Sequence, residues 1–300
     1  MLQYLCNYLT ILQHLIQRST IQLLRFHFSF FLMPVFWYAL SQVPVIDTKH
    51  ALLIFFILHG LVYPASNGYN SYMDRDTGSI GGIKNPLQPT RQLLYASILL
   101  DGIAIVCSFS ISVYFAAGII AYILASRAYS YRGIRLKKYP VAGYLTVIFF
   151  QGAVTFFLVM HGSSMDKTLH VPLFGMIAAS LLIGGFYPLT QIYQHEQDKQ
   201  DGVNTLSMLL GYKGTFLFTA VVYMLAITAL AIQLFSSMQQ QSFFIIQLFF
   251  LPVLIYFFWW FKKVVDNHAA ANFVRTMRMN MLASLCTNAA FITLFLIERT

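Results

Sequence analysis

Nine long apolar runs constrain the fold of this chain more than any other feature. They fall near residues 23–41, 51–69, 93–110, 112–129, 141–160, 171–191, 215–235, 243–261 and 279–297. A helix needs about 17 to 25 mostly apolar residues to cross the roughly 30 Å hydrocarbon core of a bilayer. Hydrophobic residues make up 58% of the chain and charged residues only 10%, which excludes an ordinary water-soluble core. The sequence therefore predicts an all-α, polytopic membrane protein with nine transmembrane helices.

The basic residues predict how these helices are oriented. With a cytoplasmic N-terminus, 16 of the 19 Lys and Arg residues fall on the cytoplasmic side, and only Lys49, Lys167 and Arg299 fall on the other. This asymmetry is typical of membrane proteins, whose cytoplasmic loops are rich in Lys and Arg. We therefore expect a multi-pass protein of the cell (inner) membrane, with no nucleic-acid partner for its net charge of +9. Residues 1–20 are expected to form an amphipathic segment lying on the bilayer, and residues 21–300 a single membrane domain.

One polar stretch occurs twice. Residues 63–78 read YPASNGYNSYMDRDTG, and residues 187–202, which lie 124 positions later, read YPLTQIYQHEQDKQDG. The pattern indicates an internal duplication. On a helix, positions i, i+3 and i+7 share one face, so each copy is expected to present two amides and a carboxylate together. These trios are Asn67, Asn70 and Asp74 in the first copy and Gln191, Gln194 and Asp198 in the second.

The two copies concentrate acidic residues in a chain that has few. They hold five of its ten Asp and Glu residues, and both are expected at the cytoplasmic face beside the basic loop Tyr129–Pro140. A solvated acidic face is the simpler interpretation, but it gives no reason for the same spacing to occur twice. Carboxylate and amide oxygens suit Mg²⁺, and two clusters suggest two metal sites. Cations next to Arg and Lys can hold a pyrophosphate as it leaves, so we expect an amphiphilic substrate with a diphosphate head.

These motifs resemble those of the UbiA superfamily of intramembrane prenyltransferases. The first family signature, Asn-Asp-x-x-Asp-x-x-x-Asp, is matched by NSYMDRDTG at Asn70, Asp74 and the Arg75–Asp76 pair. The second, Asp-x-x-x-Asp followed by Gly-x-x-Thr-Leu and Leu-Gly, is matched by QHEQDKQDGVNTLSMLLG from Asp198 to Gly211. The resemblance covers nearly the whole chain and implies a UbiA-like helical bundle.

The resemblance also implies an activity and a site. It implies Mg²⁺-dependent transfer of a prenyl group from a prenyl diphosphate to a small hydrophobic acceptor, expected to be an aromatic ring of the quinone-precursor type. The implied metal-binding residues are Asn70, Asp74, Asp76, Gln194, Asp198 and Asp201. The implied diphosphate-binding residues are Arg25, Asn67, Arg135, Lys137, Tyr193 and Lys199. Asp74, Asp198 and Lys137 are the expected catalytic residues.

The chain departs from the family signatures at three positions. Ser71, Gly78 and Gln194 stand where the family has acids. We therefore expect weaker Mg²⁺ binding unless Asp76, Glu196 and Asp201 compensate. Two alternatives stay open at this point. One is a non-catalytic membrane protein of the same fold that binds lipid diphosphates, and the other is a transporter built from repeats.

Overall fold

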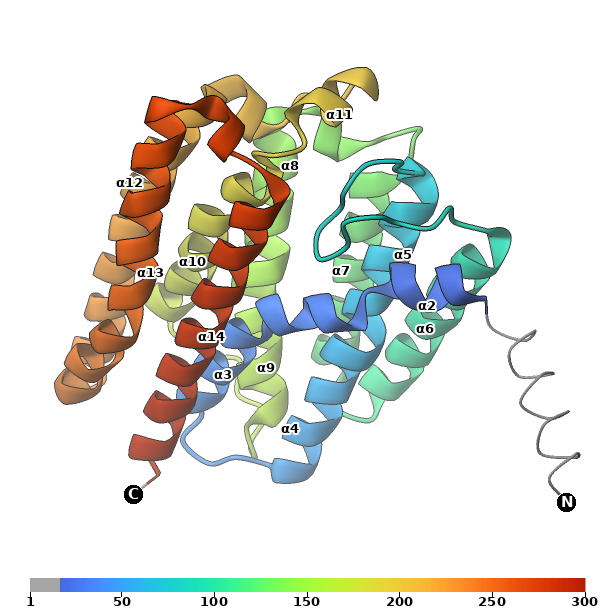
Figure 1. Ribbon diagram of the computed structural model, residues 1–300. Helices are drawn as coiled ribbons and strands as arrows, with labels where there is room; N and C mark the ends of the chain where they lie inside the picture. Colours follow the sequence, from blue (N-terminus) through green and yellow to red (C-terminus); the bar gives the residue numbers. More distant parts are fainter. Residues whose placement is uncertain (1–16, 300) are drawn as a thin grey trace, which may run out of the picture.

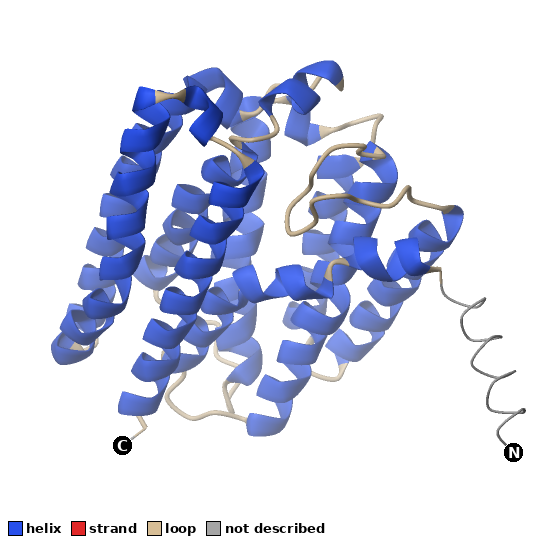
Figure 2. Ribbon diagram, viewed as in Figure 1, coloured by secondary structure: helices blue, strands red, loops and turns tan. Residues whose placement is uncertain are grey.

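The computed structural model describes residues 17–299, and they form a bundle of helices (Figures 1 and 2). Within this range, eight helical segments are long and apolar enough to cross a membrane, and a bent pair makes up a ninth. This confirms the prediction of an all-α, nine-span membrane protein. The expected amphipathic segment over residues 1–20 lies almost entirely outside the described residues.

The first span is broken. It consists of α2 (Arg18–Leu24), the 3₁₀ helix η1 (Phe26–Phe31) and α3 (Met33–Ser41), with a 40° bend before α3. Arg25 separates the first two pieces in a left-handed conformation (φ 48°, ψ 48°), which a continuous helix cannot contain. The first predicted span, near residues 23–41, is therefore present but is not one continuous helix, and α2 and η1 run across the bundle in Figure 1.

Two later spans each contain a π-helical segment. The second span runs through α4 (Thr48–Phe55), η2 (Phe56–Val62) and α5 (Tyr63–Asp74). The fifth runs through α8 (Pro140–Ile148), η4 (Phe149–Val154) and α9 (Thr155–Ser163). A β-carbon on Gly152 in η4 would lie 2.3 Å from Cα of Ser180, so only glycine permits this close approach to α10.

The remaining helices complete the bundle. They are α6 (Arg91–Phe109), α7 (Val113–Ser130), the 3₁₀ turn η3 (Leu136–Lys138), α10 (Leu173–Gln191), α11 (His195–Gln200), α12 (Leu206–Ser236), α13 (Gln240–Asp266), the 3₁₀ turn η5 (His268–Ala270) and α14 (Phe273–Ile297). Thr219 on α12 donates a hydrogen bond to the carbonyl of Gly185 on α10 (2.8 Å), which fixes these two helices side by side. Such small and hydroxylated residues hold helices together where lipid removes the hydrophobic drive for association.

The two copies of the polar stretch meet at one end of the bundle. The loop that follows α5 and the short helix α11 both lie at this end, shown at the top of Figure 1. The first trio lies on α5 as expected. The second does not share a helix, because α10 ends at Gln191 and Gln194 is the N-cap of α11. The side-chain amide of Gln194 donates to the carbonyl of Ser79 (3.2 Å), in the loop that follows α5.

Candidate active site

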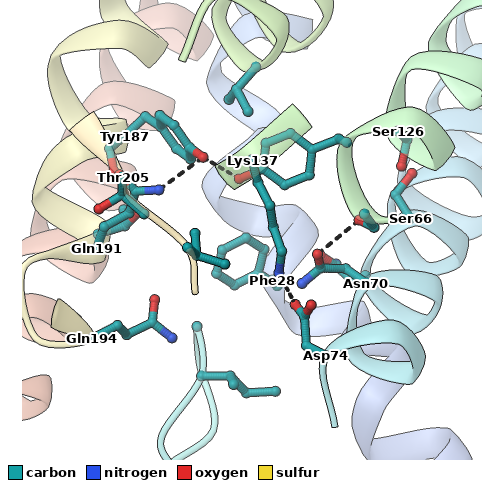
Figure 3. A pocket seen from close by; sticks show the side chains of 18 of the residues that line it. Phe28, Ser66, Asn70, Asp74, Ser126, Lys137, Tyr187, Gln191, Gln194 and Thr205 are labelled. Carbon is teal, nitrogen blue, oxygen red and sulfur yellow. Dashed lines mark hydrogen bonds and ion pairs between the residues drawn. The ribbon is translucent and has the colours of Figure 1, made fainter. Parts of the chain in front are cut away.

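A polar cavity of about 220 Å³ opens between the two copies, and we refer to it as the polar cavity. All six members of the trios line it despite the break in the second copy. Figure 3 shows Asn70 and Asp74 on one side, and Tyr187, Gln191 and Gln194 on the other. A turn after the helix thus brings Gln194 and Asp198 to the place that a continuous helix was expected to provide.

Lys137 links the basic loop to the first acidic segment. Its side chain is 12% exposed and forms an ion pair with Asp74, toward which it reaches across the cavity in Figure 3. Asp74 is itself only 4% exposed, and Nη2 of Arg135 lies 3.7 Å from its Oδ1. A buried carboxylate needs such cationic partners to remain ionised. Lys137 and Asp74 therefore pair at the centre of the site, with Arg135 close to the same carboxylate.

Arg135 connects the first segment to the second. Its guanidinium forms an ion pair with Asp201 and donates to the Asp201 carbonyl (3.0 Å). Arg135 adopts a left-handed conformation (φ 50°) and does not line the polar cavity. Arg135, which was predicted to bind diphosphate, thus contacts the carboxylates of both acidic segments from outside the lining of the polar cavity.

Two carboxyl groups in the site have raised pKa values. Burial, reinforced by the negative charge of Asp74, raises the pKa of Asp76 to about 6. Burial also raises the pKa of Asp198 to about 7, although Lys137 opposes the shift. Burial thus disfavours the charged form of both carboxyl groups, and a cation bound beside them would favour that form.

The oxygen atoms of the site fit Mg²⁺. Oδ2 of Asp198 and Oε1 of Gln191 are buried without a hydrogen-bond partner within residues 17–299, and Oδ1 of Asn70 accepts only from Ser130 (2.9 Å). Hard oxygen donors with free lone pairs are the ligands that Mg²⁺ prefers. In the described part of the chain, no three His, Cys, Asp or Glu residues lie close enough to hold a metal on their own. The set therefore suits ions that complete their shells with water and substrate phosphate.

Ten of the residues predicted for the site line this cavity, whereas Arg135 and Lys199 do not. Those that line it are Arg25, Asn67, Asn70, Asp74, Asp76, Lys137, Tyr193, Gln194, Asp198 and Asp201. Lys199 is exposed on α11 and is not among the lining residues, so its role stays a prediction.

The structure adds residues that the sequence analysis missed. The hydroxyl groups of Tyr129 and Tyr187 hydrogen-bond to each other, and Gln191 donates to Tyr187 (3.0 Å). Gln197 crosses between the two acidic segments and donates to Asp76 (2.6 Å). Tyr63 and Tyr187 occupy equivalent positions in the two copies, but of the two only Tyr187 lines the polar cavity. The repeat in the sequence could not show this difference.

A second, apolar cavity adjoins the polar one. Its volume is about 170 Å³, and we refer to it as the chamber. It lies between η1, α3, α10 and α14, and residues such as Phe28, Tyr187 and Asn280 line both spaces. A charged head group and an apolar group can thus occupy neighbouring spaces.

The sequence matches one protein family over most of its length. The model of the UbiA prenyltransferase family covers residues 31–282. The chain belongs to this family. Family membership confirms the resemblance seen in the two acidic motifs, and a UbiA family protein is a membrane prenyltransferase by class. A comparison with curated protein sequences gives no significant match.

Several solved structures share the fold of this UbiA family protein. A UbiA homologue from Archaeoglobus fulgidus, determined with GPP and Mg²⁺ and also with DMAPP and Mg²⁺, has a TM-score of 0.65 at 17% identity, covering 92% of this chain and 99% of that one. A homologue from Aeropyrum pernix K1 has a TM-score of 0.65 at 18% identity over 90% and 98% of the two chains. Digeranylgeranylglyceryl phosphate synthase has a TM-score of 0.61 at 18% identity over 93% and 98%. At these identities the likeness shows the fold.

Proposed function

We propose that this UbiA family protein transfers a prenyl group from a prenyl diphosphate to a small hydrophobic acceptor within the membrane, with Mg²⁺ as cofactor. The observation that carries the proposal is one cavity lined by Lys137 and both acidic segments, directly beside an apolar chamber. The Archaeoglobus fulgidus structures with GPP or DMAPP and Mg²⁺ support the choice of donor and metal. The expected acceptor is an aromatic ring of the quinone-precursor type, and the expected location is the inner membrane, with the site at the cytoplasmic face.

The acidic segments would hold the metal ions. The first metal site would consist of Asn70, Asp74 and Asp76, and the second of Gln194, Asp198 and Asp201. All six residues line the polar cavity. Bound Mg²⁺ supplies positive charge that offsets the negative charge of the departing pyrophosphate. Ser71 and Gly78 supply no carboxylate, and Asp76 lies between them on the cavity wall.

The basic residues would hold the diphosphate. The polar cavity receives hydrogen-bond donors or positive charge from Lys137, Arg25, Asn67 and Tyr193. When a prenyl diphosphate enters, Lys137 can leave Asp74 and bind a phosphate oxygen instead. We assign Arg135 to positioning Asp74 and Asp201 as well as to attracting the anion. Lys199, which is exposed on α11, would attract the diphosphate as it approaches from solvent.

The reaction breaks one bond and forms another. The bond between C1 of the prenyl group and the diphosphate oxygen breaks, and the electron pair leaves with the pyrophosphate. The faces of Tyr129, Tyr187 and Phe150, which line the cavity, stabilise the resulting allylic cation and exclude water. A carbon of the acceptor ring then donates its π electrons to C1, and the ring loses a proton to solvent.

The test is product formation in a membrane. The purified protein is reconstituted in lipid vesicles with geranyl, farnesyl or geranylgeranyl diphosphate and a panel of phenols and naphthols, in Mg²⁺ or in EDTA. We expect a prenylated product by mass spectrometry in Mg²⁺ alone. Saturable donor binding without any product would contradict the proposal and favour the non-catalytic, lipid-diphosphate-binding alternative.

A further inference from the structure

The chamber has a polar helix face as well as apolar walls. Helix α14 presents Asn280, Ser284 and Thr287 to it, at i, i+4 and i+7, so they share one helix face about 10 Å long. Apolar side chains line it from the first span (Phe31, Leu32 and Val35) and from α10 (Leu182, Ile183 and Phe186). Further polar atoms come from Tyr38, Gln151, Tyr187 and Thr190. The chamber therefore differs from a simple slot for a hydrocarbon chain.

Two buried polar atoms of the chamber have no hydrogen-bond partner among residues 17–299. Asn280 is 6% exposed and its Oδ1 is buried without a hydrogen bond, and the same holds for the hydroxyl of fully buried Tyr38. No hydrogen bond joins the hydroxyls of Ser284 or Thr287 to another residue of the range 17–299. Burying a polar group without a partner is costly, and a bound ligand with matching groups would remove that cost.

The chamber also contains no charge. None of its lining residues is Lys, Arg, His, Asp or Glu, whereas Arg25 and Lys137 line the polar cavity instead. A carboxylate placed in the chamber would be desolvated without a cationic partner. The hydrogen-bonding wall is thus suited to hydroxyl groups and unsuited to acids.

Resting on the proposed function, we infer that the chamber binds the acceptor and that the acceptor is an uncharged, hydroxylated aromatic ring. The aromatic side chains of Phe31, Phe186 and Phe291 pack against the ring, and its hydroxyl groups bond to the α14 wall. Asn280 lines both spaces, so a ring held there lies next to the donor. The donor tail then takes the opposite side of the polar cavity, against Tyr122, Val147 and Phe150.

The inference is tested by binding, without donor or Mg²⁺. The probes are 2-naphthol, naphthalene and 6-hydroxy-2-naphthoate, measured by equilibrium dialysis against the protein in nanodiscs, with empty nanodiscs subtracted. We expect the wild-type protein to bind 2-naphthol at least about tenfold more tightly than the carboxylated probe. Asn280→Leu should weaken 2-naphthol binding about tenfold and leave naphthalene binding unchanged, because only the hydroxylated ring loses a hydrogen bond.

A smaller substitution guards against a folding defect. Ser284→Ala should weaken 2-naphthol binding about threefold, again without effect on naphthalene. Tighter binding of the carboxylated probe, no saturable binding of 2-naphthol, or unchanged 2-naphthol affinity in both variants would overturn the inference. A protein that binds 2-naphthol as expected but transfers no prenyl group would retain this assignment and lose the proposed function.

Discussion

The side-chain amide of Gln197 donates a hydrogen bond to Oδ1 of Asp76 over 2.6 Å, and so joins the second acidic segment to the first. Gly78, two residues after Asp76, lies directly against this contact. A β-carbon at Gly78 would fall 2.5 Å from Oε1 of Gln197. The absence of the family's acid at position 78 therefore leaves room for a contact that orients another acid.

This contact predicts energetic coupling between two positions. Gly78→Ala should push Gln197 away from Asp76 and weaken apparent Mg²⁺ affinity about fivefold, the value of one hydrogen bond. Gln197→Ala should have a similar effect. Combining the two should cost no more than either alone, because both remove the same interaction. Additive losses in Mg²⁺ titrations of activity would show that Gly78 acts in another way.

Asp74 and Asp198 should be indispensable for turnover. Asp74→Asn or Asp198→Asn should each lower kcat at least about a hundredfold, because each removes charge from the site where pyrophosphate departs. Asp101→Asn is the matched control, since Asp101 is a buried acid paired with Arg127 between α6 and α7, away from the polar cavity. It should keep kcat within about threefold while lowering the melting temperature, because Arg127 loses its partner. Normal turnover in either Asn variant of the site would exclude it as a metal ligand.

Lys137 and Arg135 should affect different constants. Lys137→Met should raise the KM for the donor about tenfold, since Lys137 faces the cavity and can contact phosphate. Arg135→Ala should raise the Mg²⁺ requirement as well, because Arg135 holds Asp201 in place. Excess Mg²⁺ should therefore partly rescue Arg135→Ala and leave Lys137→Met unchanged. Equal rescue of both variants would contradict the separate roles.

The metal-free protein should lose stability as pH rises. The pKa of Asp198 is about 7 in the folded protein, compared with an ordinary value of 3.8. Between these values the unfolded chain has released a proton that the folded chain still holds, so unfolding is favoured by rising pH. In EDTA the melting temperature should fall by about 2 to 4 °C between pH 5 and pH 8. Mg²⁺ should reverse the fall and Asp198→Asn should reduce it, whereas a rise in melting temperature over this range would contradict the assignment.

The sequence predicted the fold and the composition of the site better than its geometry. Nine apolar runs and the spacing of Asn67, Asn70 and Asp74 were sufficient to predict the bundle and the helical face of α5. The end of α10 at Gln191 was not predictable, because the helical spacing of polar residues continues past it to Asp198, and the break depends on the backbone conformation at Gln194 (φ −101°, ψ 1°). The break at Arg25 likewise depends on the backbone conformation of one residue within an apolar run.

Some site residues had no signal in the sequence. Gln197 and Asn280 are ordinary polar residues by spacing, and only the folded chain places one across the two acidic segments and the other between two cavities. Lys199 shows the reverse case. It lies within the second motif, but the orientation of α11 leaves its side chain exposed.

The central claim is that the two acidic segments form a single metal-dependent site for a prenyl diphosphate. The most direct measurement is pyrophosphate release from geranyl and farnesyl diphosphate as a function of Mg²⁺, with the wild-type protein, Asp74→Asn, Asp198→Asn and the Asp101→Asn control. Mg²⁺-dependent release by the wild type and the control, lost in both site variants, is the expected result. Release that is independent of Mg²⁺, or that survives the loss of either segment's aspartate, would contradict it.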